Sequence, residues 1–216
     1  MGVYTIFRRE LTSYFLTPLA YIFIVIFLAM AGTFTFFVGN FFGRGQADLQ
    51  PFFQFHPWLY LFLVPAISMR LWSEERKQGT IELFLTLPIG LGQAVLGKFL
   101  AGWAFLAIAV LLSFPMALTV GYLGAPDWGV IVTTYVGAIL MAGGYLGVCA
   151  LASAMTKNQV ISFVISLGAC AVLLFLGFSS FTETLEGVLP LAAAAGAKNS
   201  LASSISSGER TFTYID

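Results

Sequence analysis

One short stretch, residues 69–92, carries the main cluster among the twenty charged side chains of this sequence, while the segments around it are long apolar runs. Six charged residues fall within thirteen positions there: Arg70, Glu74, Glu75, Arg76, Lys77 and Glu82. Ser73 can cap the start of a helix, and Glu74 and Glu75 then lie in its first turn, where the helix dipole favours acids. Adjacent carboxylates on a helix point in different directions, so this pair is poorly suited to acid–base catalysis. We expect the pair to face water or a partner protein.

The second half of the stretch predicts another short helix. Gly79 interrupts the first helix, Thr80 can cap the next, and apolar residues recur at helical spacing through Phe84 until Pro88 ends the pattern. About eight helical residues at about 1.5 Å each give a rod of roughly 12 Å. Such a rod is too short to cross a membrane, but it can lie on the membrane surface and present a charged face to a partner.

Composition defines the class of protein. The chain has 216 residues, of which 59% are hydrophobic and 9% charged, whereas soluble domains carry about 25% charged residues. We therefore expect a polytopic membrane protein. The formal net charge of zero argues against a nucleic-acid partner. Cys149 and Cys170 lie inside apolar runs without the spacing of metal ligands, so we expect buried thiols and no metal site.

The N-terminal residues 2–16 predict an amphipathic helix. Val3, Phe7 and Leu11 fall on one face, and the basic residues fall elsewhere. Such a helix lies in the plane of the membrane interface with its basic side toward anionic headgroups, and Pro18 then turns the chain into the bilayer. The residues that we assign to this interfacial helix and its turn are Arg8, Arg9, Glu10, Tyr14 and Pro18.

Five apolar segments are long enough to cross a hydrocarbon layer of about 30 Å. They cover residues 18–39, 51–72, 94–122, 129–154 and 160–179. The fold class that we predict is an all-α membrane bundle, with a single membrane domain over residues 1–216. It contains the interfacial helix at 1–17, the five spans within 18–180, and an outer-side tail at 181–216 that leads toward a probable sixth span beyond this sequence.

Three features of the spans lead to specific expectations. Pro51, Pro57 and Pro65 interrupt the second span, which we expect to be irregular and kinked. His56 is expected at the outer mouth of that span as an interfacial side chain. Lys98, near the start of the third span, is expected to extend its ammonium group to the interface.

The distribution of Lys and Arg predicts the orientation. With the N-terminus inside, seven basic residues are cytoplasmic, and Arg44 alone lies in the first two outer loops. The seven are Arg8, Arg9, Arg70, Arg76, Lys77, Lys98 and Lys157. We expect a multi-pass protein of the cell (inner) membrane with a cytoplasmic N-terminus and the charged stretch in the cytosol.

Other patterns exclude some functions. Residues Gly92 to Lys98 fit G-x-x-x-x-G-K, but Phe99 follows where a phosphate loop needs Ser or Thr, and no strand precedes them. The spans carry no Asp, Glu or His at mid-depth, which lowers the expectation of an ion-coupled transporter or an intramembrane enzyme.

A stripe of small residues in the fourth span predicts close contact between helices. The stripe consists of Gly143, Gly147, Ala150 and Ala154. We favour contact within one subunit and keep an interface between subunits as the alternative.

The charged stretch resembles a known family. Glu74-x-x-x-x-Gly79-Thr80-x-Glu82, followed by Pro88, is similar to the cytoplasmic signature of ABC-2-type permeases, the membrane subunits of one class of ATP-binding-cassette exporters. The segment from Arg9 to Pro18 resembles the interfacial helix of that family and its turn into the first span. The resemblance extends over about residues 1–180, and it is strongest to permeases associated with gliding motility and with maturation of nitrous oxide reductase.

The resemblance implies a six-span permease that dimerises with a second copy or a paralogue, each half docked on a cytoplasmic ABC ATPase. It implies that the charged stretch is the coupling helix seated on that ATPase, that ATP and Mg²⁺ are bound by the ATPase, and that this chain binds no cofactor. Further envelope proteins are possible partners. The residues that match or adjoin the coupling signature are Glu74, Glu75, Arg76, Gly79, Thr80, Glu82, Phe84 and Pro88.

Two hypotheses follow for the function. The leading one is a transport subunit that couples ATP hydrolysis in a partner to export or to mechanical work. The alternative is a membrane scaffold that recruits a cytoplasmic protein through the same helix without moving anything. A cavity lined by Phe, Gly and Ala would suit a lipid or a peptide, so the sequence leaves the substrate open.

Overall fold

The computed structural model describes residues 2–45, 48–79 and 90–177. Within these ranges every regular element is a helix and none is a strand, in agreement with the predicted all-α class. The chain divides into two compact units, Met1–Val172 and Leu173–Asp216, and the features below belong to the first unit. The predictions for the tail and for a sixth span lie outside the described residues.

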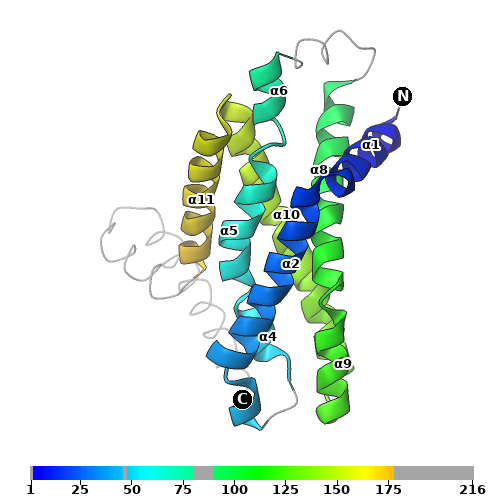
Figure 1. Ribbon diagram of the computed structural model, residues 1–216, viewed down its shortest axis with the longest axis vertical. Coiled ribbons are helices and arrows are strands. Elements are labelled where there is room, and N and C mark those ends of the chain that lie inside the picture. The colour runs from blue at the N-terminus through cyan, green and yellow to red at the C-terminus, as the bar shows by residue number, and fades with distance from the viewer. Residues whose placement is uncertain (1, 46–47, 80–89, 178–216) are drawn as a thin grey trace, which may run out of the picture. The chain divides into compact units, whose positions relative to one another are not determined.

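The N-terminal segment folds as its sequence predicts. Helices α1 (Val3–Leu16) and α2 (Pro18–Thr33) meet at Thr17, whose extended backbone ends the first helix. The Thr17 hydroxyl donates a hydrogen bond to the carbonyl of Tyr14 at 2.7 Å. Pro18 stands in the first turn of α2, where its missing N–H group leaves no helical acceptor unsatisfied. Figure 1 shows α1 set at an angle to α2.

Beyond α2 the helix widens into a single π-helical turn, η1 (Phe34–Val38). Asn40 then adopts a left-handed conformation with a φ of 46° and starts the short helix α3 (Phe41–Arg44). Asn tolerates this conformation better than most residues. The predicted polar loop after the first span therefore begins with a sharp change of direction.

Four helical segments of the described residues are long and apolar enough to cross a membrane, where the sequence predicted five spans. They are Pro18–Val38, Gly92–Leu123, Trp128–Met155 and Gln159–Leu176. The predicted second span consists of two shorter helices, α4 (Gln50–Gln54) and α5 (His56–Ser68), separated at Phe55.

The prolines of the second segment explain its division. Pro57 stands in the first turn of α5, where proline is accommodated, and Pro65 lies inside the same helix. The predicted irregularity is present, and neither α4 nor α5 alone reaches spanning length, so the described residues show four of the five predicted spans as helices of spanning length. Buried side chains of α5 such as Tyr60 and Val64 nevertheless belong to the core.

The third predicted span contains an interruption that the sequence analysis did not anticipate. Helix α8 (Leu91–Leu111) ends before Ser113, and α9 (Phe114–Leu123) continues with a proline in its first turn. The hydroxyl of Tyr135, in the next long helix, donates to the carbonyl of Ser113 at 3.1 Å. The interruption is therefore hydrogen-bonded within the protein, as backbone groups at membrane depth must be.

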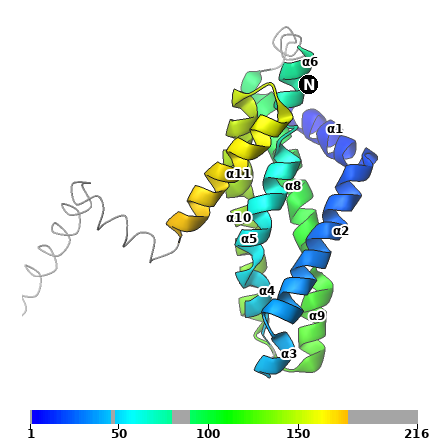
Figure 2. The ribbon, with the colours of Figure 1, turned by 60° about the vertical axis from the view of Figure 1, so that its left-hand side comes forward.

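The core is built around α10 (Trp128–Met155), which the helix α11 (Gln159–Leu176) follows in the chain. Helix α10 packs against α5 and α8, and α8 also packs against α1; Figures 1 and 2 show α5, α8 and α10 running side by side. Two long side chains donate to one turn of α10. The Tyr60 hydroxyl reaches the carbonyl of Ala138 at 3.2 Å, and the Trp103 indole reaches that of Ile139 at 2.8 Å.

The small-residue stripe of α10 lies partly against α8. A Cβ atom on Gly143 would come within 2.9 Å of the Trp103 indole nitrogen, and one on Gly147 would lie 3.8 Å from the Phe99 ring. The two glycines thus make contacts within one chain, as we favoured. Ala150 is half-buried and the side chain of Ala154 is exposed, so contact of these two with another subunit stays a prediction.

His56 is not the interfacial side chain that the sequence suggested. Its side chain is 1% exposed, and its Nδ1 lies 2.9 Å from the carbonyl oxygen of Phe52. The rings of Phe27 and Tyr60 meet it edge to face at 5.8 and 5.5 Å between centroids. Aromatic rings from two helices surround the imidazole and exclude water from it, so it belongs to the core.

Gly97 allows α1 to approach α8. A Cβ atom there would come within 2.9 Å of Ile6 and 3.2 Å of the Val3 carbonyl oxygen, whereas a Cβ atom on Gly92 would meet nothing within 4 Å. We predict that Gly97→Val destabilises the purified protein by about 1–3 kcal/mol through overpacking. The matched Gly92→Val should change stability by less than about 0.5 kcal/mol. Thermal unfolding in detergent measures both, and equal melting temperatures would contradict the close approach.

Candidate functional site

A short charged helix, α6 (Ser73–Gln78), follows α5 at the end of the bundle where α1 also lies (Figure 1). Glu74 and Glu75 occupy its first turn, as predicted. Gly79 ends it in a left-handed conformation with a φ of 72°, which a residue with a side chain adopts only with strain. From Lys77 onward the helix is exposed.

The start of α6 is capped by a residue that the sequence pattern did not indicate. We predicted Ser73 as the cap, but its hydroxyl donates to the carbonyl of Met69. The hydroxyl oxygen of Ser153, in α10, accepts hydrogen bonds from the backbone N–H groups of Trp72 and Ser73 at 3.1 and 3.2 Å. Ser153 is fully buried and satisfies two donors that have no partner within α6.

Arg76 makes a second attachment between α6 and α10. Its guanidinium donates to the carbonyl of Ala154, in the last turn of α10. A cation at the carboxyl end of a helix is favoured by the helix dipole. The coupling helix that the sequence predicted is therefore fixed along one side to the end of a membrane helix.

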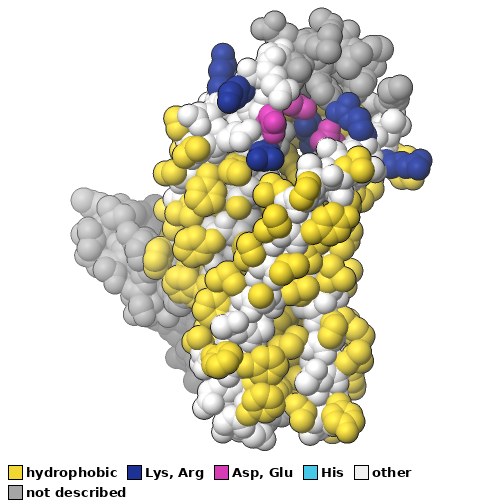
Figure 3. All heavy atoms as spheres, in the orientation of Figure 1, with side chains coloured by type: hydrophobic (Ala, Val, Ile, Leu, Met, Phe, Trp, Pro, Cys, Tyr) yellow, Lys and Arg dark blue, Asp and Glu magenta, His cyan; other side chains and the backbone are white. Residues whose placement is uncertain are grey.

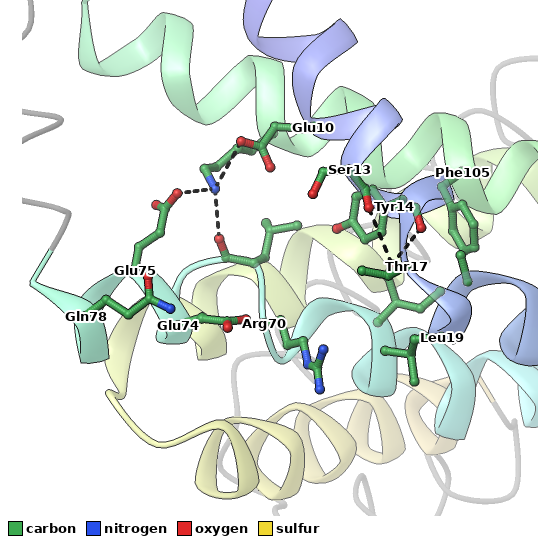
Figure 4. Close-up of a pocket in the computed structure, with 14 residues that line it drawn as sticks. Glu10, Ser13, Tyr14, Thr17, Leu19, Arg70, Glu74, Glu75, Gln78 and Phe105 are labelled. Atoms are coloured by element: carbon green, nitrogen blue, oxygen red, sulfur yellow. Dashed lines mark hydrogen bonds and ion pairs between the residues drawn. The ribbon is translucent and has the colours of Figure 1, made fainter.

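We expected Lys98 to extend its ammonium group to the membrane interface, but the structure buries this group among protein side chains. Its side chain is 5% exposed, and Nζ lies 2.7 Å from Glu75 Oε1 and 3.7 Å from Glu10 Oε1. Nζ also donates to the carbonyl of Leu71 at 3.3 Å and lies 5.2 Å from the centroid of the Trp72 ring. Dashed lines in Figure 4 mark the ion pairs that end at the labelled Glu10 and Glu75. Oxygen acceptors and an aromatic face supply what a buried ammonium group requires.

The Lys98 cluster, which we define as Lys98, Glu75 and Glu10, joins three helices. Glu10 belongs to α1, Glu75 to α6 and Lys98 to α8. The side chain of Glu75 is only 17% exposed, so the expectation that both carboxylates face water or a partner is wrong for Glu75. Glu74 is half-buried.

The remaining residues assigned to the interfacial helix have different surroundings. Arg8 is exposed, and the exposed Arg9 places Nη2 2.7 Å from Glu10 Oε1. Tyr14 stacks on Phe105 of α8 with 5.3 Å between ring centroids. Burial, and secondarily the Glu10 carboxylate, raise the pKa of the Tyr14 phenol far above its usual range, so the phenol stays neutral. Pro18 is exposed.

The stretch from Gly92 to Lys98, whose pattern resembles a phosphate loop, is helical in the structure. This whole stretch belongs to α8, so its interior N–H groups are directed along a helix and do not form a loop around a phosphate. In the parts of the chain that the structure describes, no three His, Cys, Asp or Glu side chains form a metal-binding group. Cys149 and Cys170 are buried free thiols with their sulfur atoms 3.3 Å apart.

Part of the predicted coupling signature lies outside the described residues. This part consists of Thr80, Glu82, Phe84 and Pro88. The sequence analysis also missed two residues that hold α6, Ser153 and Lys98. Lys98 carried a usable signal, because a lone charge in a long apolar segment usually has a partner inside the protein, whereas Ser153 had none.

These features define a multi-pass α-helical membrane protein in which most of the charged side chains of the described residues lie at one end, as Figure 3 shows for one face. Residues 45–190, more than half of the chain, match the family described as ABC-2 family transporter protein. The chain belongs to this family, which confirms the resemblance drawn from the sequence.

Two relatives are named as a probable ABC transporter permease protein NosY, from Pseudomonas aeruginosa (strain PAO1) and from Stutzerimonas stutzeri. Each is 43% identical to this chain over 63 residues, which cover 27% of this chain and 23% of the relative. The matched part thus spans less than a quarter of the length of these relatives.

Removing the buried cation should reveal how strongly the Lys98 cluster holds the helices. We predict that Lys98→Met destabilises the protein by about 3–5 kcal/mol, because it leaves carboxylates without their cation in a half-buried site. The double variant Lys98→Met/Glu75→Gln should be more stable than the sum of the single effects by about 1 kcal/mol or more. Unfolding of the purified variants measures this cycle, with exposed Lys157→Met as control. Additive effects would contradict a direct interaction.

The cap from α10 gives a second stability prediction. Ser153→Ala leaves the N–H groups of Trp72 and Ser73 without an acceptor and should cost about 1–3 kcal/mol. Hydrogen exchange at those two amides should accelerate. Ser162→Ala is the matched control, because Ser162 is equally buried and its hydroxyl has no hydrogen-bond partner among the residues that the structure describes. If both variants behave alike, Ser153 does not cap α6.

Proposed function

We propose that this chain is the permease subunit of an ABC exporter, and that α6 is the segment on which a separate cytoplasmic ATPase acts. The proposal rests on the contacts that attach α6 to the membrane helices. Ser153 and Arg76 attach it to α10, the Lys98 cluster attaches it to α8 and α1, and its last turn is exposed. Well-packed helices transmit displacement because their interiors hardly compress, so a push on α6 would move the helices to which it is attached.

The charge distribution supports a cytosolic position for α6. The attachments of α6 bring α1 and the end of α10 to the same end of the bundle, so the basic residues of α1 and α6 gather there with Lys157, which follows α10. The side rich in Lys and Arg usually faces the cytosol. We therefore propose that the N-terminus and α6 are cytoplasmic and that the chain lies in the inner membrane.

Membership of the ABC-2 family supports an ATPase partner. The Pseudomonas aeruginosa and Stutzerimonas stutzeri relatives carry the name of an ABC transporter permease, and we extend that role to this chain. ATP and Mg²⁺ would be bound by the partner, since the Gly92 to Lys98 pattern is helical here. We further propose that two permeases, identical or paralogous, pair in the membrane and that further envelope proteins join the assembly.

The proposed cycle uses the two kinds of attachment. Closure of the two ATPases would shift each α6, and the bonds from Ser153 and Arg76 would carry α10 with it. The Lys98 cluster would carry α8 and the interfacial helix. Repacking of rigid helices about the interface of the pair would then open a path for a substrate or drive an attached envelope protein.

Reversing a charge in the predicted coupling stretch, residues 69–92, should disrupt the ATPase contact. We predict that Lys77→Glu, and likewise Glu82→Lys, lowers the amount of co-expressed ABC ATPase that purifies with the chain by about tenfold, because charges at a contact determine register and orientation. The control is Arg44→Glu, in α3, which should retain the ATPase.

The ATP hydrolysis rate of the purified complexes separates the hypotheses. A rate that depends on the permease supports a transport subunit, and bound ATPase with an unchanged rate supports the scaffold alternative. Full retention of the ATPase by both variants would show that α6 is not the docking segment.

A further inference from the structure

A cavity of about 390 Å³ lies beside the Lys98 cluster, between α1, α5, α6 and α8. Figure 4 shows Ser13 and Thr17 along one side of it, and Arg70 and Glu74 on the opposite side. Its volume falls within the range of small-molecule sites, which is about 300–1,000 Å³. The cavity is large enough for a compact polar group, and its chemistry indicates which one.

The charges around the cavity divide into two sets. Lys98 is neutralised by Glu75 and Glu10, as described above. Arg70 and Glu74 line the same cavity, and neither forms an ion pair in the described part of the chain. The cavity therefore offers one cation and one anion that are available to an incoming group.

The rest of the lining is apolar and belongs to the membrane helices. Leu19 and Ala20 come from the first turn of α2, Ile67 from α5 and Phe105 from α8. Helix α1 is amphipathic and α2 begins the first membrane span at Pro18, so this corner is at the level of the lipid headgroups. The cavity is thus charged on its outer side and apolar toward the bilayer.

We propose that this cavity binds the headgroup of a zwitterionic phospholipid that carries a primary amine. The phosphate pairs with the guanidinium of Arg70, which suits phosphate oxygens. The ammonium group pairs with the carboxylate of Glu74, and its remaining N–H donors reach the hydroxyl of Ser13. The start of the acyl chains follows Leu19 and Ile67 into the bilayer.

The same groups discriminate between headgroups. A choline headgroup has no N–H donors for Glu74, so it forfeits the charge-assisted hydrogen bonds. A glycerol headgroup has no ammonium group to pair with Glu74, so that carboxylate stays uncompensated beside the phosphate. The site should therefore prefer phosphatidylethanolamine to phosphatidylcholine and to phosphatidylglycerol.

Native mass spectrometry of the purified full-length chain tests this inference. Dioleoyl phosphatidylethanolamine, phosphatidylcholine and phosphatidylglycerol are offered one at a time, and the lipid-bound fraction is measured. We expect the wild type to bind the ethanolamine lipid about tenfold more tightly than the choline lipid, on the scale of charge-assisted hydrogen bonds. Glu74→Gln should bring that ratio close to one, and Arg70→Gln should weaken ethanolamine-lipid binding by about tenfold.

Two further variants serve as controls. Arg70→Lys keeps the cation and should retain most of the binding, and Lys157→Gln removes an exposed cation that does not line the cavity and should change nothing. The ratio of ethanolamine-lipid to choline-lipid binding is measured within each folded variant. The result for Glu74→Gln therefore tests the proposal even if Arg70→Gln does not fold. Equal binding of the ethanolamine and choline lipids by the wild type, a preference for phosphatidylglycerol, or an unchanged ratio in Glu74→Gln would overturn the proposal.

Discussion

The ammonium group of Lys98 is the point on which the charged end of this protein depends. It is almost fully buried at the start of a membrane helix, and burial of an ammonium group without partners is prohibitively unfavourable. Glu75 and Glu10 can supply those partners only if α6 and α1 stay close to α8. A single cation therefore couples the position of α6 to that of α1, and disturbing one of them disturbs the other.

Helix α10 provides the frame for this arrangement. Near its middle it accepts hydrogen bonds from Tyr60 and Trp103, and at its end Ser153 and Ala154 hold α6. The glycine at position 143 leaves room for the Trp103 indole. The long helix that carries the small-residue stripe is thus also the one to which the charged helix is attached, so packing in the bundle and the position of α6 are not independent.

Features that depend on residues close together in the sequence could be predicted, whereas features that depend on residues far apart in the sequence could not. The turn at Thr17 and Pro18, the acids in the first turn of α6 and its end at Gly79 depend on local backbone sterics and the helix dipole, and the sequence predicts them correctly. The cap of α6 could not be predicted, because Ser153 is 80 residues away. The direction of the Lys98 side chain likewise depends on carboxylates that are distant in the sequence but close in the structure. The prolines predicted that the second span is irregular, but they did not predict that it divides at Phe55 into two helices, neither of which has spanning length.

The distance along the chain between α6 and its cap also has a consequence for biogenesis. Ser73 leaves the ribosome 80 residues before Ser153, a delay on the order of 4 to 16 s at ordinary rates of translation. During that interval α6 has neither its acceptor nor the carbonyl of Ala154. Its basic residues are therefore still unattached when the first spans orient themselves in the membrane, and the helix gains its final position only after α10 has been inserted.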